Sequence, residues 1–127
     1  MAKKVFDLEK AVNDILTEYG DSITENVQEA AKKVTKAGVK AVKQNAGSSF
    51  KGTGKYASGW TSKFETGRLS AQGVIYNKKL PGLPHLLEHG HAKRGGGRVE
   101  GKAHIKPVEE QIVKQFEEAI TNDISRN

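Results

Sequence analysis

The first third of the chain is constrained by apolar residues spaced for one face of a helix. They recur mostly every three or four positions, as Leu8, Val12, Ile15, Leu16, Tyr19, Ile23, Val27, Ala30 and Val34. This spacing places them on a single helical stripe. The stripe keeps its phase across Gly20, and one glycine costs only about 1 kcal/mol in a helix interior. We therefore predict one long helix over residues 7–44, kinked or straight at Gly20.

A break at Gly20 is the alternative, because Ser22 and Glu25 have the spacing of a capping box that would begin a second helix. If the helix is continuous, at 1.5 Å per residue it is more than about 50 Å long. A small domain does not need a helix of that length. Such a helix extends past its own core and indicates contact with another molecule.

Two short runs in the middle of the chain have the pattern of an antiparallel hairpin. Residues 60–65 and 74–77 are rich in aromatic and β-branched side chains, and Gly67 lies in the turn region between them. Trp60, Ser62 and Phe64 alternate with polar residues, as expected of a sheet with one face on a core. We expect the long helix to cover that face.

The last third combines a short helix with a longer one. Pro84 can open a helical turn that must end near Gly90, and a third strand is possible at residues 102–105. From Pro107, apolar residues recur every four positions as Val108, Ile112, Phe116 and Ile120. The predicted fold class is α+β, with a long N-terminal helix on a small antiparallel sheet, a short helix and a C-terminal helix.

We expect the 127 residues to form a single domain, since this length can bury a core without disulfides or metal. The chain has no cysteine, which excludes thiolate ligands and cysteine nucleophiles and fits a reducing compartment. Neither a signal peptide nor a membrane span is expected from the sequence. Two stretches rich in glycine and basic residues, 45–58 and 91–102, are predicted to be flexible loops.

The net charge of +6 conceals a strong segregation along the chain. Residues 1–30 carry three Lys against seven acidic residues, whereas residues 31–106 carry sixteen Lys and Arg against three acidic residues. Residues 107–127 are acidic again, with two bases and five acids. The basic middle could bind nucleic acid, or it could pair with the acidic ends of the same chain or of a neighbouring subunit.

All four histidines lie within twenty residues, but they do not follow a zinc-site pattern. His85 and His89 are four apart, as on one helix face. Zinc hydrolases that use this spacing have Glu directly after the first His, where this chain has Leu86. We therefore predict no metal site, and we expect the histidines to be polar loop residues.

No enzyme pattern is found either. The Gly95–Gly97 tract and the Gly52–Lys55 segment both lack the Lys-Ser/Thr pair of a phosphate-binding loop. There is no nucleophile elbow, and the carboxylates of the central region are too scattered to form an acid/base pair. The expectation is a protein without catalytic activity or cofactor.

Basic side chains in predicted loops are the candidate functional residues. They can grip phosphates or an acidic protein, although lysines that only keep a chain soluble would look the same. These candidates are Lys51, Lys55, Lys78, Lys79, Lys93, Arg94, Arg98 and Lys102.

Three segments carry a resemblance to a known family when they are read in order. Thr53–Trp60 (TGKYASGW) is followed by Val74–Asn77 (VIYN), then by Pro84–His91 (PHLLEHGH) and Gly101–Pro107 (GKAHIKP). The first matches a "TG-x-Y/L-x-x-S/G-W" segment and the fourth a "H/F-I/L-x-P" segment. The third matches a "Y/H-x-x-x-L-E-x-G" segment at Leu87, Glu88 and Gly90, and departs from it at Leu83, where the pattern has Tyr or His. In this order the chain resembles, over essentially its whole length, the tail-component (tail-completion) family of long-tailed bacteriophages, encoded in the head–tail joining gene cluster.

The resemblance implies a non-enzymatic structural protein in the neck of the virion, present in the host cytoplasm during assembly. It implies a ring, sixfold in symmetry, between the head-closure protein and the tail terminator protein. Basic loops of such a ring could also make non-specific contact with the genomic DNA that leaves through its channel. The alternative hypothesis is a small basic nucleic-acid-binding protein.

Overall fold

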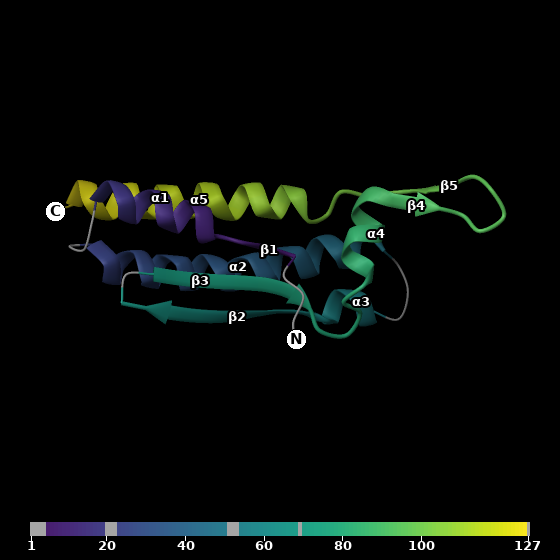
Figure 1. The fold of residues 1–127 in the computed structure, drawn as a ribbon, viewed down its shortest axis with the longest axis horizontal. Helices are drawn as coiled ribbons and strands as arrows, with labels where there is room; N and C mark the ends of the chain where they lie inside the picture. Colours follow the sequence, from purple (N-terminus) through teal and green to yellow (C-terminus); the bar gives the residue numbers. More distant parts are fainter. Residues whose placement is uncertain (1–4, 20–22, 51–53, 69, 127) are drawn as a thin grey trace.

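The computed structural model describes residues 5–19, 23–50, 54–68 and 70–126 (Figure 1). Its elements in chain order are β1 (Phe6–Asp7), α1 (Glu9–Tyr19), α2 (Thr24–Ser49), α3 (Lys55–Ser58), β2 (Trp60–Gly67), β3 (Ser70–Asn77), α4 (Leu83–His89), β4 (Gly90–Ala92), β5 (Arg98–Glu100) and α5 (Lys106–Arg126). The predicted α+β class is confirmed. None of the helices in these ranges is both long enough and apolar enough to cross a membrane.

The main sheet has three antiparallel strands in the order β1-β3-β2. The predicted hairpin is confirmed, with Trp60 paired to Asn77 at one end and Gly67 to Ser70 at the other. The third strand is β1, in which Phe6 pairs with Ile75, and the strand considered at residues 102–105 is not present. Backbone N–H groups of that stretch bond instead to a side chain of α4, so they are not free to extend a sheet.

The single helix predicted over residues 7–44 is wrong. The helical stretch is divided into α1 and α2, which run in opposite directions (Figure 1). Gly20 and Ser22 of the proposed break lie outside the described residues. Each helix buries one apolar stripe on the same core, with Val12 fully buried in α1 and Val27 in α2. Two antiparallel helices that share a core can therefore have apolar residues in one continuous helical spacing. That spacing alone does not show that the chain reverses direction between them.

Helix α2 packs against the sheet and against α5, and it approaches both closely. A Cβ added to Gly38 would lie 3.0 Å from Ile75 of β3 and 3.1 Å from Ile112 of α5. On the sheet side, a Cβ added to Gly73 would overlap the buried side chain of Thr35. The two glycines thus permit the close packing of α2 in this core.

The predicted C-terminal helix is confirmed as α5. Its four apolar residues at intervals of four, Val108, Ile112, Phe116 and Ile120, are each at most 1% exposed. This stripe lies on α2, and the opposite side of α5 faces solvent. The helix extends from the α4 end of the molecule to the other end (Figure 1).

The two predicted loops contain regular structure. Residues 45–49 form the last turn of α2, and 55–58 form α3, whereas 51–53 lie outside the described residues. Within 91–102, β4 and β5 form a two-stranded hairpin, so the prediction of a loop without secondary structure is wrong for this stretch. The tract turns because Gly96 and Gly97 adopt positive φ angles of 105° and 82°, and Lys93 bonds to both of them through its backbone.

Candidate functional site

One end of the molecule is held by a buried polar network around Tyr56 and His104. The Tyr56 hydroxyl lies 2.6 Å from His104 Nε2, and the imidazole of His104 is fully buried. Asn77, at the end of β3, donates from Nδ2 to the carbonyl of Tyr56 and accepts from the N–H of Leu80. This network joins α3, β3 and the segment before α5.

Glu88 of α4 is the second part of this network. Oε1 accepts the backbone N–H groups of His104 and Ile105 at 2.8 and 2.9 Å, and Oε2 accepts that of Lys106 at 3.0 Å. These groups precede or begin α5, whose next residue, Pro107, has no N–H. A carboxylate eighteen residues away therefore caps α5 and places negative charge at the positive end of the helix dipole.

The electrostatics fit an ionised Glu88 beside a neutral Tyr56. Burial alone would raise the pKa of Glu88, but the N–H groups of His104, Lys106 and Ile105, with the nearby His104 imidazole, lower it below its ordinary value. Burial, with the charge of Glu88, raises the pKa of Tyr56 well above its ordinary value. His104 Nδ1 lies 2.9 Å from Glu88 Oε1 and 2.8 Å from the carbonyl of Lys102. A proton on Nδ1 leaves Nε2 to accept from the tyrosine hydroxyl.

The segments that carry the family resemblance meet in this network. Tyr56 belongs to the first segment, Asn77 to the second, Glu88 to the third and His104 to the fourth. Trp60 of the first segment is 1% exposed and lies edge-on to Tyr56, with ring centroids 5.7 Å apart. These residues are mutually bonded and mostly buried. They fix the arrangement of α3, α4 and α5 rather than offering a surface to a partner.

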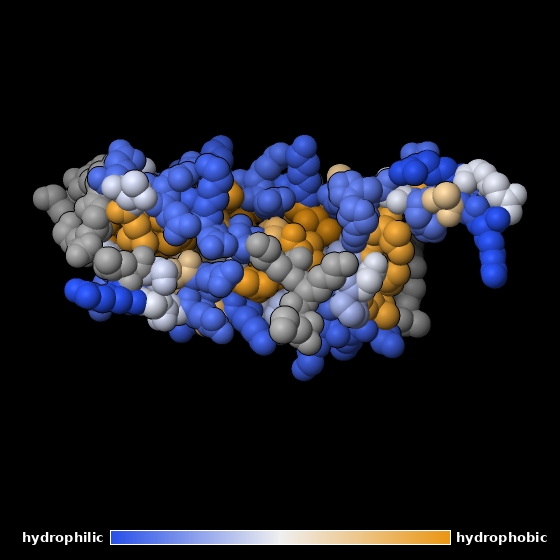
Figure 2. Space-filling view, in the orientation of Figure 1, coloured by the Kyte–Doolittle hydropathy of each residue, from blue (hydrophilic) through white to orange (hydrophobic). Residues whose placement is uncertain are grey.

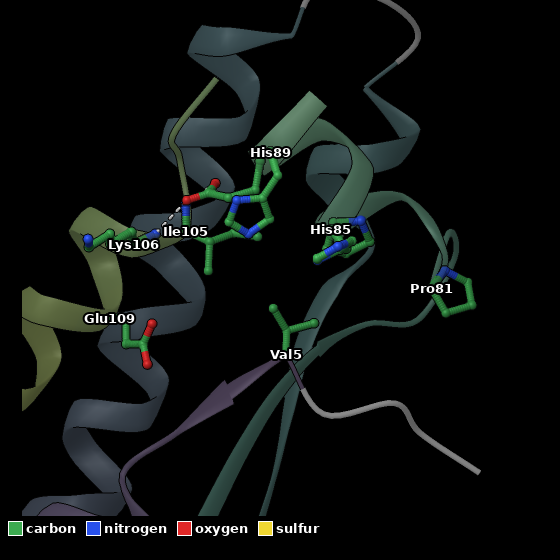
Figure 3. Close-up of a pocket in the computed structure, with 9 residues that line it drawn as sticks. Val5, Pro81, His85, His89, Ile105, Lys106 and Glu109 are labelled. Atoms are coloured by element: carbon green, nitrogen blue, oxygen red, sulfur yellow. Dashed lines mark hydrogen bonds between the residues drawn. The ribbon is translucent and has the colours of Figure 1, made fainter. Parts of the chain in front are cut away.

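A pocket of about 350 Å³ lies beside Glu88 (Figure 3). His85 and His89 line it from α4, and Val5, Ile105 and Glu109 line its other side. The rings of His85 and His89 have centroids 4.8 Å apart, but no group of three or more His, Cys, Asp or Glu could hold a metal ion within the described residues. Glu88 is occupied by backbone donors, so it is not available as an acid or base in the pocket.

His104 is not the polar loop residue that the sequence suggested. It is buried and bonded on both ring nitrogens. Its sequence neighbours gave no sign of this, because two of its three ring partners, Glu88 and Tyr56, lie sixteen and forty-eight residues away.

The basic candidate residues lie on the elements at the α3–α4 end, and several are tied down there. Lys79 donates to the hydroxyl of Ser58, and Arg98 to the carbonyl of His89. Lys102 donates to the carbonyl of Ser49, with its ammonium 5.8 Å from the centre of the Phe50 ring. Lys55 and Lys78 are exposed on α3 and after β3, and Lys93 and Arg94 lie at the tip of the β4–β5 hairpin. Lys51 lies outside the described residues.

A second group of basic residues lies on a helix and was not among the predicted candidates, which all lie in predicted loops. The solvent-facing side of α2 carries five exposed lysines within about three turns, with no acidic residue between Glu29 and Glu65. These residues, called the lysine face below, are Lys32, Lys33, Lys36, Lys40 and Lys43. Their spacing follows the helical period of the exposed side, so the same periodicity that predicted the apolar stripe could have predicted this face.

Helices α1 and α5 contact each other and carry most of the exposed acidic residues. These two helices carry seven exposed acidic side chains but three exposed lysines. One of those lysines, Lys10, is paired with Asp14 at 3.1 Å. The acidic face is formed by Glu9, Asp14, Glu18, Glu109, Glu110, Glu117 and Glu118. The segregation seen along the sequence is therefore also a segregation between helices.

Comparisons of the chain with protein-family models, curated proteins and solved structures find no match.

Proposed function

We propose that this protein is a structural component of the neck of a long-tailed bacteriophage, where it completes the tail at the head–tail interface. The observation that carries the proposal is the separation of charge on one small domain: the acidic face of α1 and α5 is distinct from the lysine face of α2 and from the basic α3–α4 end. The family resemblance supplies the biological setting.

Two unlike surfaces on one domain suit a closed ring. In a cyclic assembly with head-to-tail contacts, each subunit presents one surface to its neighbour and receives a different one. Opposite charges on these surfaces favour the correct contact and disfavour like-to-like pairing. Under this proposal the partners are further copies of the chain, in a sixfold ring, with the head-closure and tail terminator proteins above and below it.

The first test measures self-association of the purified full chain by native mass spectrometry and sedimentation over a range of concentration and salt. Rings are expected at low salt. Reversing two acidic residues, Glu110→Lys with Glu117→Lys, should weaken assembly at least tenfold. The control, Gln72→Lys, adds a positive charge on the exposed outer side of the sheet, and it should assemble as the unchanged chain does. A monomer under every condition, with or without isolated tails, would contradict the proposal.

The second test is genetic. In the phage genome that carries this chain, interrupting its coding sequence should leave filled heads and full-length tails that do not join. Electron micrographs of the lysate distinguish joined from separate particles. Normal yields of joined particles would refute a role in the neck.

Binding of duplex nucleic acid is the second candidate function, and the lysine face favours it. Each phosphate contact releases counterions, so contacts by the five lysines would make log K fall with log salt with a slope of about −4.5. Lys33, Lys36 and Lys40 changed to Gln should reduce that slope. The matched control removes the same charge at Lys10, Lys63 and Lys114, and it should leave the slope unchanged. Binding that does not depend on salt would exclude this function.

A further inference from the structure

We infer that the β4–β5 hairpin is a docking arm whose basic tip binds the acidic surface of α5 on a second copy of the chain. This inference rests on the proposed ring, and it names the contact through which the copies would join. The arm is defined as residues 90–101, and the receiving surface as Glu109, Glu110, Glu117 and Glu118 of α5.

The base of the arm is fixed to the body. The N–H of Lys102 donates to the carbonyl of Leu87 at 2.8 Å, and the guanidinium of Arg98 donates to the carbonyl of His89 at 2.6 Å. At the base, Gly90 and Gly101 are so close that a Cβ on either would overlap the backbone of the other strand or of α4. Glu88, which caps α5, lies directly before this base. The direction of the arm is therefore set by the same network that sets α5.

The tip of the arm, in contrast, extends beyond the body without support. Residues 92–100 are all exposed, Val99 among them. Figures 1 and 2 show the hairpin projecting past the other elements, with hydrophilic residues at its outer end beside others of intermediate hydropathy. A two-stranded hairpin is marginally stable in water on its own. A hairpin with a fixed base and an exposed tip can gain stability when its tip packs against the surface of another molecule.

Charge indicates which surface this is. The arm carries Lys93, Arg94 and Arg98 against Glu100 alone. Along the solvent side of α5, two adjacent shallow grooves are lined by four glutamates and by Lys106 and Lys114. An arm with net positive charge is complementary to this surface and would be repelled by the lysine face of α2.

The arm does not reach the acidic part of its own α5. It leaves the network at the α4 end and points outward, whereas α5 runs from the same network toward the opposite end of the molecule (Figure 1). Glu109 and Glu110 lie in the first two turns of α5, close to the base of the arm but away from its outward-pointing tip. Glu117 and Glu118 lie about three turns along α5 and are farther still from the tip. The complementary partner of the arm is the α5 of another molecule, which gives the head-to-tail contact of a ring.

Cross-linking tests this contact, because the chain has no natural cysteine. Two full-length variants, Arg94→Cys and Glu117→Cys, are mixed and treated with a short bismaleimide at low salt. A covalent dimer that contains one of each is expected in large excess over dimers of either variant alone. In the control, Gln72→Cys on the outer side of the sheet replaces Glu117→Cys, and it should give at least tenfold less product. Equal yields with Gln72→Cys would overturn the inference.

Charge exchange provides an independent test by sedimentation. Lys93→Glu with Arg94→Glu should raise the dissociation constant for self-association at least tenfold, as should Glu110→Lys with Glu117→Lys. A mixture of the two variants should regain assembly, because the acidic arm of one now meets the basic α5 of the other. If the arm variant forms rings with unchanged affinity, the arm inference fails while the proposed function stands. If the unchanged chain never assembles, both fail.

Discussion

Glu88 is expected to be the side chain of α4 whose loss most destabilises the fold. Its carboxylate side chain is only 7% exposed and caps α5 through three backbone N–H groups. Two of these donors, on His104 and Ile105, belong to buried residues, and the third, on Lys106, belongs to an exposed one that water can solvate. Each buried donor left without a partner costs about 1–3 kcal/mol. Glu88→Ala should therefore lower the free energy of unfolding by about 3–5 kcal/mol.

Glu88→Gln tests the contribution of the negative charge, because glutamine has nearly the same shape as glutamate but is neutral. The amide keeps one oxygen for His104 and Ile105, but its NH₂ group faces the N–H of Lys106 and the negative charge at the helix N-terminus is lost. The expected loss is about 1–2 kcal/mol, mostly from that repulsion and from the helix dipole. Urea unfolding followed by circular dichroism at pH 7 measures both variants. Glu118→Gln on the exposed side of α5 removes the same charge and should change stability by no more than about 0.5 kcal/mol.

The same residue predicts how stability depends on pH. Because the folded pKa of Glu88 is below its unfolded value of about 4.3, the carboxylate contributes its full stabilisation above that unfolded value. The contribution is lost as pH falls through the folded pKa. The stability difference between the unchanged chain and Glu88→Gln should thus be constant from pH 7 to about 5 and shrink below about 4.3. A difference that is already absent at pH 7, or equal to that of Glu118→Gln, would refute the proposed capping role.

Three further substitutions test the packing around this network. Tyr56→Phe removes the hydroxyl that bonds His104, and it should cost about 1–3 kcal/mol in urea unfolding because a buried ring nitrogen loses its partner; a neutral result would show that the bond adds nothing. Gly73→Ala places a methyl group against Thr35, so it should lower stability by about 1–3 kcal/mol, and Thr35→Ala in the same chain should restore part of the loss. Gly90→Ala forces a side chain into a φ of 81° and toward the β5 backbone; nuclear magnetic resonance should show altered amide shifts throughout the hairpin, and unchanged shifts there would contradict the close approach.

Periodicity predicted those elements whose burial depends on local spacing. The α5 stripe and the alternation of Trp60, Ser62 and Phe64 in β2 could be read directly, because each such pattern has one structural solution at its length. The apolar spacing could not show the division between α1 and α2, because two antiparallel helices and one continuous helix bury the same apolar stripe. The sequence signal for a second helix was the capping-box spacing of Ser22 and Glu25. A reversal of direction is a tertiary property, set by the contacts of both helices with β3 and α5.

Long-range polar contacts were also beyond the sequence pattern. Glu88 lies in the helical turn predicted between Pro84 and Gly90, but its role as the cap of α5 depends on three N–H groups that lie sixteen to eighteen residues later. His104 was read with the other histidines as a loop residue, yet its ring is completely buried. His85 and His89, four residues apart in the sequence, lie side by side on α4 with ring centroids 4.8 Å apart.

The segments that carry the family resemblance lie mainly in the buried polar network, and this limits what the resemblance can predict for this chain. Tyr56, Asn77, Glu88 and His104 bond to one another or to the backbone that they bring together, so any chain that folds in this way has reason to keep residues of these types. The surfaces that would meet a partner lie elsewhere, on the α2 lysines, the α5 glutamates and the hairpin tip. Many charged sequences can build such surfaces. Apart from the base of the arm, none of these surfaces lies within the segments that carry the resemblance. The motifs are therefore better predictors of the fold than of the partner, and charge-exchange experiments on the surfaces test the function that the motifs alone leave as a proposal.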